Sequence, residues 1–489
     1  MRRVLAIIAT GALAATLTAC DGETITPGPT TATSSGSQPV ATPAALEGGA
    51  ADLGIKWNWN LKPPLQFAQQ VGWGETFFEV EYCAVRELPQ ARRYAQVDRL
   101  VGQAQQMGYR MMLKIRVGSC AGGSAELDPA EGTRKRPSTF PDDPAAYTAF
   151  VKDLVARYQA KGVKIWAIEN EVDANNFWSG TPQQYVDLVA LASGAIREAD
   201  PQAIVLDAGI SSTGYGVALA GELLDAGKED EALALYQQWY ERRLQGASSR
   251  FPRVESVAAL RTLLADGRAK RVREMVAANW QAVNAGGVSA YQLHFYENPT
   301  LLPTLLDYIR RHLTRPLPIQ GWEIGTAWPG SAYTPEQHGA ETAQMLATLL
   351  RERVSPVVYL PLAYTPGGAT KEEIFRGLVS PDGAVQPAGE VYAALAAATK
   401  TSTAIHEIDF ATGSGTLIEG PSASYAVVWP KAGQDLQVSS DQARSAARPS
   451  AAPSGERSLT PVLLPLPGGQ DAARDALSTA LGSPVTLAG

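Results

Sequence analysis

Two carboxylates at the ends of two apolar segments are the groups in this chain best suited to chemistry. Glu171 follows the apolar run 165–168, and Glu323 ends the run 318–323 much later in the chain. An apolar run between a helix-like segment and a loop is typical of a buried parallel strand. Glycoside hydrolysis needs two carboxyl groups, one as a proton donor and one as a nucleophile or base. The sequence therefore predicts that the fold brings Glu171 and Glu323 together as a catalytic pair.

The elements that would position this pair alternate regularly between apolar and amphipathic segments. The apolar segments predicted as strands are 53–59, 76–82, 110–117, 163–169, 203–208, 288–295, 318–323 and 357–362. The amphipathic segments predicted as helices include 95–107, 144–160, 181–199 and 388–398. Eight strands alternating with helices predict an α/β fold, the (β/α)8 barrel, whose strand ends share one pocket. An open doubly wound sheet would show the same alternation, although no glycine-rich phosphate motif follows the first strand.

Changes in composition divide the chain into a leader, a linker, a barrel and a terminal module. The predicted bounds are 1–20, 21–50, 51–400 and 401–489, respectively. The linker is rich in Thr, Ser, Pro and Gly and has too little apolar surface to fold. Segment 216–285 is long, charged and helix-rich, so we expect a helical insertion within the barrel. Short strand-like runs between Gly, Pro and Ser turns predict a small β-rich module at the C-terminus.

The N-terminus has the pattern of an export signal. A basic start at Arg2 and Arg3 precedes a mostly apolar stretch at 4–17, which is short for a membrane span. Leu17-Thr18-Ala19-Cys20 then resembles the lipobox of bacterial lipoproteins. That resemblance implies cleavage before Cys20, lipidation of this residue, and anchoring to the outer face of the bacterial cell membrane. An ordinary signal peptide, with Cys20 incidental, is the alternative.

Two further cysteines, Cys83 and Cys120, follow consecutive predicted strands, so the ends of these strands could bring them together. In an oxidising compartment such a pair favours a disulfide, and two buried thiols are the alternative. Two cysteines and four scattered histidines offer no metal-ligand spacing, so we expect neither a metal nor another cofactor.

The charge of the chain argues against one class of partner. The 42 basic and 49 acidic residues give a net charge of −7, and no basic block is present among the predicted elements. Nucleic acid is therefore not an expected partner, and the acidic balance favours solubility rather than a particular ligand. The Gly-x-Ser-x-Gly and His-Glu-x-x-His motifs of other hydrolases are absent from the sequence. The sequence predicts no particular oligomeric state.

The two carboxylate strands resemble those of a known group of enzymes. The run 166–172 is similar to the Trp-x-Ile-x-Asn-Glu strand, and 318–325 to the Pro-Ile-x-x-x-Glu-x-Gly strand, of clan A barrel glycoside hydrolases. The nearest likeness is to the β-xylosidase and α-L-iduronidase branch. The resemblance covers about residues 52–400 and implies a retaining glycosidase acting on oligo- or polysaccharides outside the cell. Glu171 would be the acid/base and Glu323 the nucleophile.

The same resemblance implies roles for neighbouring residues. Asn170 would bind the sugar 2-hydroxyl, Tyr296 would donate a hydrogen bond to Glu323, and His294 would line the sugar site. Since a sugar face stacks on an indole, the predicted platforms are the tryptophans Trp57, Trp322 and Trp328.

Two positions depart from the pattern of that group. The second strand of the clan carries an Arg or Lys near the nucleophile, but Glu79 and Glu81 occupy this region here, so Arg116 on the third strand is the expected replacement. The eighth strand of the clan presents a Trp, for which Tyr364 is the nearest aromatic residue. The missing cation supports an alternative function, a carbohydrate-binding barrel lipoprotein without catalytic activity.

Overall fold

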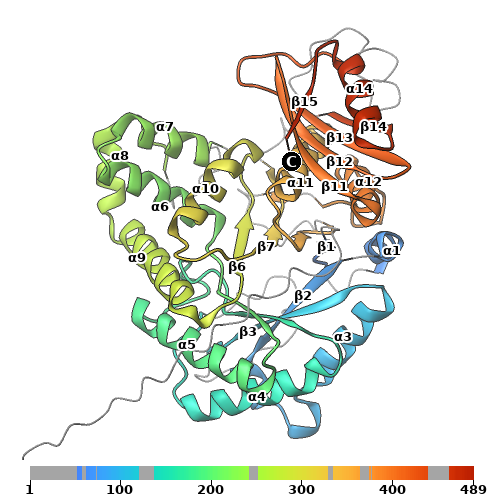
Figure 1. The fold of residues 1–489 in the computed structure, drawn as a ribbon. Helices are drawn as coiled ribbons and strands as arrows, with labels where there is room; N and C mark the ends of the chain where they lie inside the picture. The colour runs from blue at the N-terminus through green and yellow to red at the C-terminus, as the bar shows by residue number, and fades with distance from the viewer. Residues whose placement is uncertain are drawn as a thin grey trace, which may run out of the picture. The chain divides into compact units, whose positions relative to one another are not determined.

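A computed structural model gives the fold of the chain. It describes residues 52–57, 62–72, 74–119, 137–241, 252–328, 334–363, 374–375, 377–438 and 462–488. All of these lie in one compact unit, residues 45–489 (Figure 1). Within them, no helix has both the length and the apolar character that a bilayer crossing requires. The predicted lipidation site Cys20 lies outside the described residues.

Eight parallel strands form two four-stranded sheets. The first sheet has the order β2-β3-β4-β5, and its strands are β2 (Glu75–Glu81), β3 (Arg110–Arg116), β4 (Ile165–Ile168) and β5 (Ile204–Leu206). The second has the order β1-β9-β7-β6, and its strands are β1 (Leu53–Ile55), β6 (Tyr291–Phe295), β7 (Ile319–Ile324) and β9 (Val357–Tyr359). Each of the eight overlaps one of the predicted strand segments, and several are shorter than predicted.

The two sheets meet at both edges. A parallel bridge between Leu206 and Ala290 joins β5 to the segment that leads into β6. At the other edge, the backbones of β1 and β2 approach closely at a glycine. A Cβ at Gly54 would lie 2.0 Å from the carbonyl oxygen of Glu75. The first strand also pairs with the last one, β9, as the closure of a barrel requires. The predicted (β/α)8 barrel is therefore confirmed.

Side chains from six strands, with Ala290 just before β6, fill the barrel interior below its mouth. The cluster consists of Phe77, Met112, Ile165, Ala167, Leu206, Ala290, Trp322 and Val358, all buried. Two positions after a cluster residue, the chain carries a charged or polar residue on β2, β3 and β6 and just past β4. Because alternate residues of a strand share one face, these polar side chains point into the same interior as the cluster. The apolar cluster is thus the floor of a polar pocket at the carboxyl ends of the strands.

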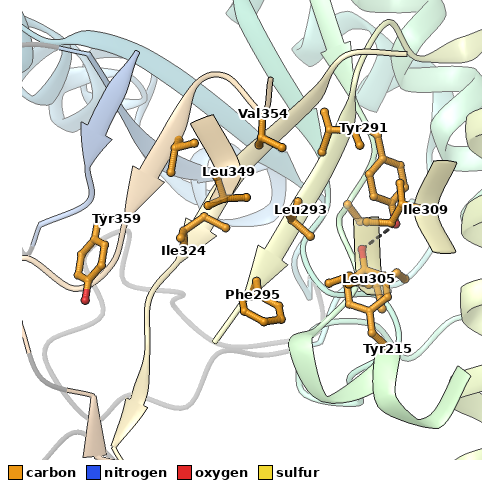
Figure 2. Close-up of a cluster of buried hydrophobic side chains, with 14 of the residues drawn as sticks. Tyr215, Tyr291, Leu293, Phe295, Leu305, Ile309, Ile324, Leu349, Val354 and Tyr359 are labelled. Atoms are coloured by element: carbon orange, nitrogen blue, oxygen red, sulfur yellow. Dashed lines mark hydrogen bonds between the residues drawn. The ribbon is translucent and has the colours of Figure 1, made fainter. Parts of the chain in front are cut away.

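The opposite faces of the strands pack against the surrounding helices. Figure 2 shows Leu293, Phe295 and Ile324 on the outer faces of β6 and β7, beside Leu305 and Ile309 of a neighbouring helix. The helices of the barrel include α3 (Ala95–Gln106), α4 (Pro144–Gln159), α5 (Pro182–Ala199), α10 (Leu302–His312), α11 (Pro335–Arg351) and α12 (Pro387–Thr401). Residues that begin helices with a side-chain cap include Asp143, Thr181 and Thr334, and such caps satisfy backbone N–H groups that have no partner within the helix.

The described residues between β5 and β6 are mostly helical, as the sequence predicts for 216–285. Its helices are α6 (Ser212–Asp225), α7 (Glu229–Tyr240), α8 (Val257–Ala265) and α9 (Gly267–Ala282), and a π-helical turn (Val283–Gly287) follows. Trp239 of α7 donates a hydrogen bond from Nε1 to the carbonyl of Ser212. Tyr215 of α6 bonds the hydroxyl of Tyr291 in β6 (Figure 2). These contacts tie the insertion to the mouth of the barrel on the β5 and β6 side.

The C-terminal part forms a five-stranded antiparallel sheet of order β14-β13-β12-β11-β15, and the predicted β module is therefore confirmed. The strands are β11 (Ala404–Phe410), β12 (Gly413–Glu419), β13 (Ala423–Pro430), β14 (Val462–Pro467) and β15 (Thr486–Ala488). The sequence analysis predicted neither β11 nor the helix α14 (Gln470–Leu481) that packs on this sheet. Thr416 donates to the Ala347 carbonyl of α11, so the module rests on a barrel helix.

Candidate active site

The first catalytic candidate, Glu171, stands just beyond the end of β4. Glu169 and Glu171 have φ values of 68° and 38°, in the left-handed region that side chains other than glycine rarely adopt. Backbone bonds hold this turn, because Glu169 N donates to Ile115 O at 2.9 Å and Glu171 N to Ala208 O at 3.0 Å. Unfavourable backbone of this kind persists where its surroundings enforce it and is concentrated at functional sites.

The second candidate, Glu323, is carried by an irregular strand. Between β6 and β7 the register passes from Leu293 opposite Gly321 to His294 opposite Glu323, so Trp322 is an extra residue. This β-bulge turns two consecutive side chains of β7 to the same side. Trp322 points into the apolar floor of the barrel, and Glu323 points into the pocket above it.

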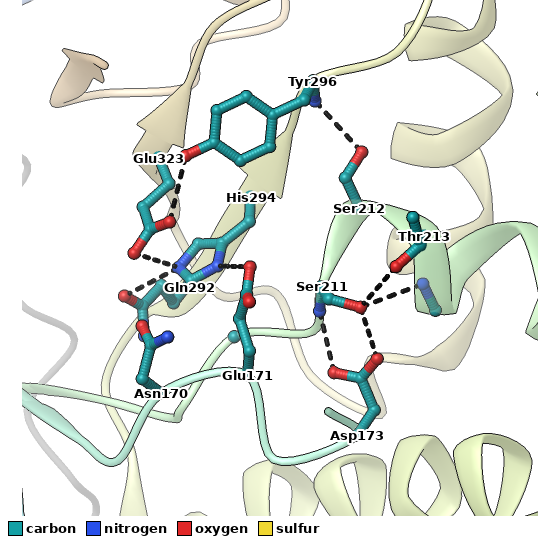
Figure 3. Close-up of polar contacts among 12 residues, drawn as sticks. Asn170, Glu171, Asp173, Ser211, Ser212, Thr213, Gln292, His294, Tyr296 and Glu323 are labelled. Carbon is teal, nitrogen blue, oxygen red and sulfur yellow. Dashed lines mark hydrogen bonds and ion pairs between the residues drawn. The ribbon is translucent and has the colours of Figure 1, made fainter. Parts of the chain in front are cut away.

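His294 of β6 lies between the two carboxylates (Figure 3). Its Nδ1 is 3.1 Å from Glu171 Oε1, and its Nε2 is 3.9 Å from Glu323 Oε1. One nitrogen of His294 and one carboxylate oxygen of each glutamate all lie within 4.8 Å of one another. The fold therefore brings together the two carboxylates that are far apart in the sequence. They remain partly exposed, whereas His294 is fully buried.

Each carboxylate oxygen of Glu323 has a described hydrogen-bond donor. The Tyr296 hydroxyl donates to Oε2 at 3.0 Å, as predicted from the resemblance, and the ammonium of Lys114 lies 3.1 Å from Oε1. Lys114 also donates to the side-chain oxygen of Asn170. Because the Asn170 oxygen is engaged in this way, its amide N–H groups are the ones left to face a ligand.

Lys114 corrects a prediction from the sequence, which assigned the missing cation to Arg116. The Arg116 guanidinium is fully buried, 2.7 Å from Glu81, 3.7 Å from Glu79 and 3.5 Å from Glu169. Arg116 therefore neutralises acidic side chains of the barrel rather than binding substrate. The signal for Lys114 is present in the sequence, because a lysine within an apolar strand, two residues before Arg116, shares its inward face.

A third carboxyl lies close to Glu171. Asp173 is buried, and Ser211 donates to it from both its backbone N–H (2.8 Å) and its hydroxyl (2.5 Å). Burial, and after it the negative charge of Glu171, raises the pKa of Asp173 to about 7. The next residue, Ser212, accepts from the backbone N–H of Tyr296 at 3.0 Å (Figure 3). The adjacent serines thus connect the loop that carries Glu171 with the segment that carries Tyr296.

Glu169 lies deeper than the catalytic candidates. It is fully buried, accepts from the Val117 backbone N–H at 2.6 Å, and forms the ion pair with Arg116. Burial raises the pKa of Glu169 to about 7, although the charge of Arg116 acts in the opposite direction. Glu169 therefore stabilises the base of the pocket through Val117 and Arg116.

The same three groups, Glu171, His294 and Glu323, are also close enough to bind a metal ion. Their contacts fit a metal poorly. The Glu323 oxygen that faces His294 is already 3.1 Å from the Lys114 ammonium, and a cation at this point would be repelled. The two ring nitrogens of His294 also point to different carboxylates, while one metal ion takes only one of them.

Two of the three predicted sugar platforms are core residues. Trp322 is fully buried, donates from Nε1 to Gln320 and packs against the ring of Phe77 in a tilted arrangement. Trp57 is 2% exposed and packs edge-on against Tyr109. An indole without exposed surface cannot stack on a sugar, so both predictions were wrong. Trp328 belongs to the short strand β8 (Ala327–Trp328), but its side chain lies outside what the structure describes, as does Tyr364.

Cys83 of α2 (Tyr82–Glu87) forms a disulfide bond. This excludes a free thiol at Cys83, one of the two alternatives from the sequence. Cys120, its predicted partner, lies outside the described residues.

No protein-family model matches the chain, and no curated protein matches its sequence. Solved structures do resemble it. A glucosidase from Croceicoccus marinus has a TM-score of 0.50 and 12% identity, with 78% of this chain and 76% of that chain covered. A family 39 glycoside hydrolase from Bacteroides cellulosilyticus WH2 has a TM-score of 0.49 and 13% identity, with coverage of 86% and 81%. A β-xylosidase from Caulobacter crescentus CB15 has a TM-score of 0.46 and 12% identity, with 79% of this chain and 76% of that chain covered. At such identities the likeness to the glucosidase supports the fold alone.

Proposed function

We propose that the protein is a retaining glycoside hydrolase that cleaves O-glycosidic bonds in oligo- or polysaccharides. The observation that carries the proposal is the short distance between two partly exposed carboxylates at the mouth of the barrel, with ligand oxygens of Glu171 and Glu323 within 4.8 Å. Retaining enzymes hold their carboxyl groups about 5–5.5 Å apart, while inverting enzymes leave room for a water at about 6.5–9.5 Å. The spacing here favours the retaining class.

The contacts of the two carboxylates suggest how the roles are divided. Glu323 faces the Lys114 ammonium and the Tyr296 hydroxyl, and both favour its ionised form, as a nucleophile needs. Glu171 faces His294 and, beyond it, no cation among its described contacts, which suits a group that gives and takes a proton. Glu323 is thus the proposed nucleophile and Glu171 the proposed acid/base.

The reaction proceeds in two displacements. In the first, the Glu323 carboxylate attacks the anomeric carbon, the glycosidic C–O bond breaks, and Glu171 gives its proton to the leaving oxygen. In the second, the ionised Glu171 takes a proton from water as the water oxygen attacks the same carbon and releases Glu323. Two inversions give net retention. Asn170 presents its amide N–H to the hydroxyl next to the anomeric carbon and stabilises the charge that develops there.

The alternative, a carbohydrate-binding barrel without catalytic activity, was based on the missing cation of the second strand. Lys114 of β3 provides a positive charge beside Glu323, so this argument no longer favours the alternative. We further propose that the protein is a lipoprotein anchored through Cys20 on the outer face of the bacterial membrane. This rests on the leader sequence. A Cys20→Ala variant should move from the membrane fraction to the soluble fraction, and unchanged membrane association would refute the anchor.

The activity is tested with the purified protein, a panel of aryl glycosides and two variants, Glu171→Gln and Glu323→Gln. Glu323→Gln should abolish hydrolysis of every substrate. Glu171→Gln should lose about 10²–10⁴-fold on poor leaving groups, the usual contribution of a general acid, and less on activated ones that depart without a proton. Glu81→Gln is the matched control, because Glu81 lies at the same mouth but pairs with Arg116.

The stereochemistry of the first-formed sugar decides between the two mechanisms. Proton NMR recorded during turnover should show product with the same anomeric configuration as the substrate. An inverted product would contradict the proposed mechanism, and no hydrolysis by the wild type across the panel would favour the binding protein.

A further inference from the structure

The two ring nitrogens of His294 face only oxygen atoms among the contacts described. Nδ1 is 3.1 Å from Glu171 Oε1, Nε2 is 3.2 Å from the side-chain oxygen of Gln292, and Glu323 Oε1 is farther from Nε2 at 3.9 Å. The ring is fully buried, so its protons must match these acceptors. Which nitrogen carries hydrogen therefore depends on how Gln292 is oriented.

The amide of Gln292 has one possible orientation. Its Nε2 donates to the backbone carbonyl of Asp207 at 2.6 Å, and a flipped amide would place two oxygens at that distance. Its backbone N–H donates to the Asp207 carboxylate at 2.7 Å, so strand β6 is fixed to this residue twice. Asp207 itself accepts from Asn279 Nδ2 at 2.8 Å and from Gly209 N at 3.2 Å. The Gln292 oxygen is thus held as an acceptor toward His294.

Because Gln292 offers an acceptor, Nε2 of His294 must carry a hydrogen. The lone pair of Nδ1 in the neutral ring then points at Glu171. Two acceptors at 3.1 Å form a hydrogen bond only when a proton lies between them, on the carboxyl or on the ring. Gly209 leaves room for the ring, since a Cβ at this position would lie 2.9 Å from Nε2.

We propose that Gln292 is a positioning residue that holds His294 in the Nε2–H tautomer. In this tautomer Nδ1 accepts a hydrogen bond from the carboxyl proton of Glu171, which Glu171 keeps until it gives that proton to the leaving group. This rests on the proposed function only in assigning the acid/base role to Glu171. When Glu171 has given up its proton, the Nδ1 lone pair faces a carboxylate. That arrangement is repulsive, and it favours the return of a proton from the attacking water.

Charged groups from several strands surround this pair. Glu171 and Asp173 follow β4, Asp207 follows β5, Glu323 lies on β7, and Lys114 of β3 is on the far side of Glu323. The acidic groups add negative charge around the pair, and Glu323 lies beside the Lys114 charge. None of them offers a hydrogen to Nδ1 in the described contacts, which leaves Glu171 as the source of that proton.

The tautomer is measured directly by nitrogen-15 NMR of the wild-type protein labelled at histidine. The chain has four histidines, and the His294 signals are those missing from a His294→Gln variant. The expected result at neutral pH is a protonated Nε2 and an Nδ1 shift typical of a hydrogen-bond acceptor. An Nδ1–H tautomer would overturn the proposal. This measurement needs no turnover, so its outcome is separate from that of the proposed function.

The second test replaces the amide that sets the tautomer. Gln292→Met removes the acceptor with little change in volume. The matched control is Gln320→Met, because Gln320 lies opposite Gln292 in the β6–β7 register, is also buried, and bonds Trp322 instead of His294. In Gln292→Met the ring can adopt the Nδ1–H tautomer, donate to the Glu171 carboxylate and stabilise its ionised form.

The expected readout is the pH profile of kcat/KM, whose basic limb reports loss of the acid proton. In Gln292→Met this limb should move to lower pH by about one unit, the equivalent of one hydrogen bond to a charged group. The control should leave the limb in place. An unmoved limb in Gln292→Met with a changed tautomer, or an equal shift in both variants, would refute the role of Gln292. If the variant does not fold, the wild-type NMR result alone decides.

Discussion

Replacing Lys114 by glutamine removes the positive charge beside the proposed nucleophile while keeping a hydrogen-bond donor of similar length. The Lys114 ammonium is fully buried, 3.1 Å from Glu323 Oε1, and also binds the side-chain oxygen of Asn170. It lies 5.0 Å from the ring centre of Phe77 as well. Since the neutral amide can still bond both partners, the substitution tests the charge rather than the hydrogen bonds.

The expected size of the effect follows from the distance. Two unit charges about 3 Å apart interact by about 5 kcal/mol at an effective dielectric constant of about 20. Glu323 is 13% exposed, and Tyr296 still donates to it, so we expect about half of this value to be realised. At about 1.4 kcal/mol per pH unit, the acid limb of the kcat/KM profile should move to higher pH by about two units.

The assay is the pH dependence of kcat/KM for one aryl glycoside in the wild type and three variants. Lys114→Gln should show the shift, and Lys114→Arg should largely restore the wild-type limb because it keeps the charge. Arg116→Gln is the matched control, since Arg116 lies on the same face of β3 but pairs with Glu79, Glu81 and Glu169. An acid limb that stays in place in Lys114→Gln, or that moves equally in Arg116→Gln, would refute the argument.

Three further outcomes follow from the contacts. Gly209→Ala should lower the free energy of unfolding by about 1–2 kcal/mol or more in urea titrations, because φ is 67° and the new Cβ would lie 2.9 Å from His294 Nε2. The pKa of Asp173 is raised to about 7, mainly by burial, so the folded state holds a proton that the unfolded state releases near pH 4. Its contribution to the free energy of unfolding is present below pH 4 and lost as the pH rises through 7. In urea titrations across this pH range, Asp173→Asn should show a smaller fall in the free energy of unfolding than the wild type. Cys83→Ser should lower the free energy of unfolding by about 4 kcal/mol in the same titration if the disulfide closes the predicted loop to Cys120. A free energy of unfolding equal to that of the wild type would contradict that pairing.

The eight strands of the barrel could be predicted because each is a short apolar run buried on both faces. The sequence did not predict the helix α14, and the reason lies in its composition. Within α14 (Gln470–Leu481) the apolar residues are mostly alanines, and its buried residues are Ala473, Leu477 and Ala480. A face this small gives a weak periodic signal, and the helix is stabilised by packing on the sheet instead.

The sequence predicts which residue types form the site. It does not predict how far along its strand, from the floor to the mouth of the barrel, each side chain lies. Lys114 and Arg116 face the same way, and the sequence does not show which one reaches Glu323. The register answers this, because Lys114 lies opposite Ala167, close to the floor, while Arg116 lies near the end of its strand. The position of Trp322 was equally hidden from the sequence. Strict alternation would put this residue and Glu323 on opposite faces of β7, and the bulge puts them on the same side.

Both catalytic candidates depend on a break in regular strand geometry. The left-handed residues after β4 lift Glu171 out of the alternation, and the bulge in β7 lets one strand supply both the floor residue Trp322 and the pocket residue Glu323. Such irregularities cost free energy, so contacts from other strands must hold them. Here the backbone carbonyls of Ile115 and Ala208 hold the turn after β4, and Lys114 with Tyr296 holds Glu323. The distance between the carboxylates is therefore a property of the whole barrel mouth, and a change in any of these partners should alter catalysis before it alters the fold.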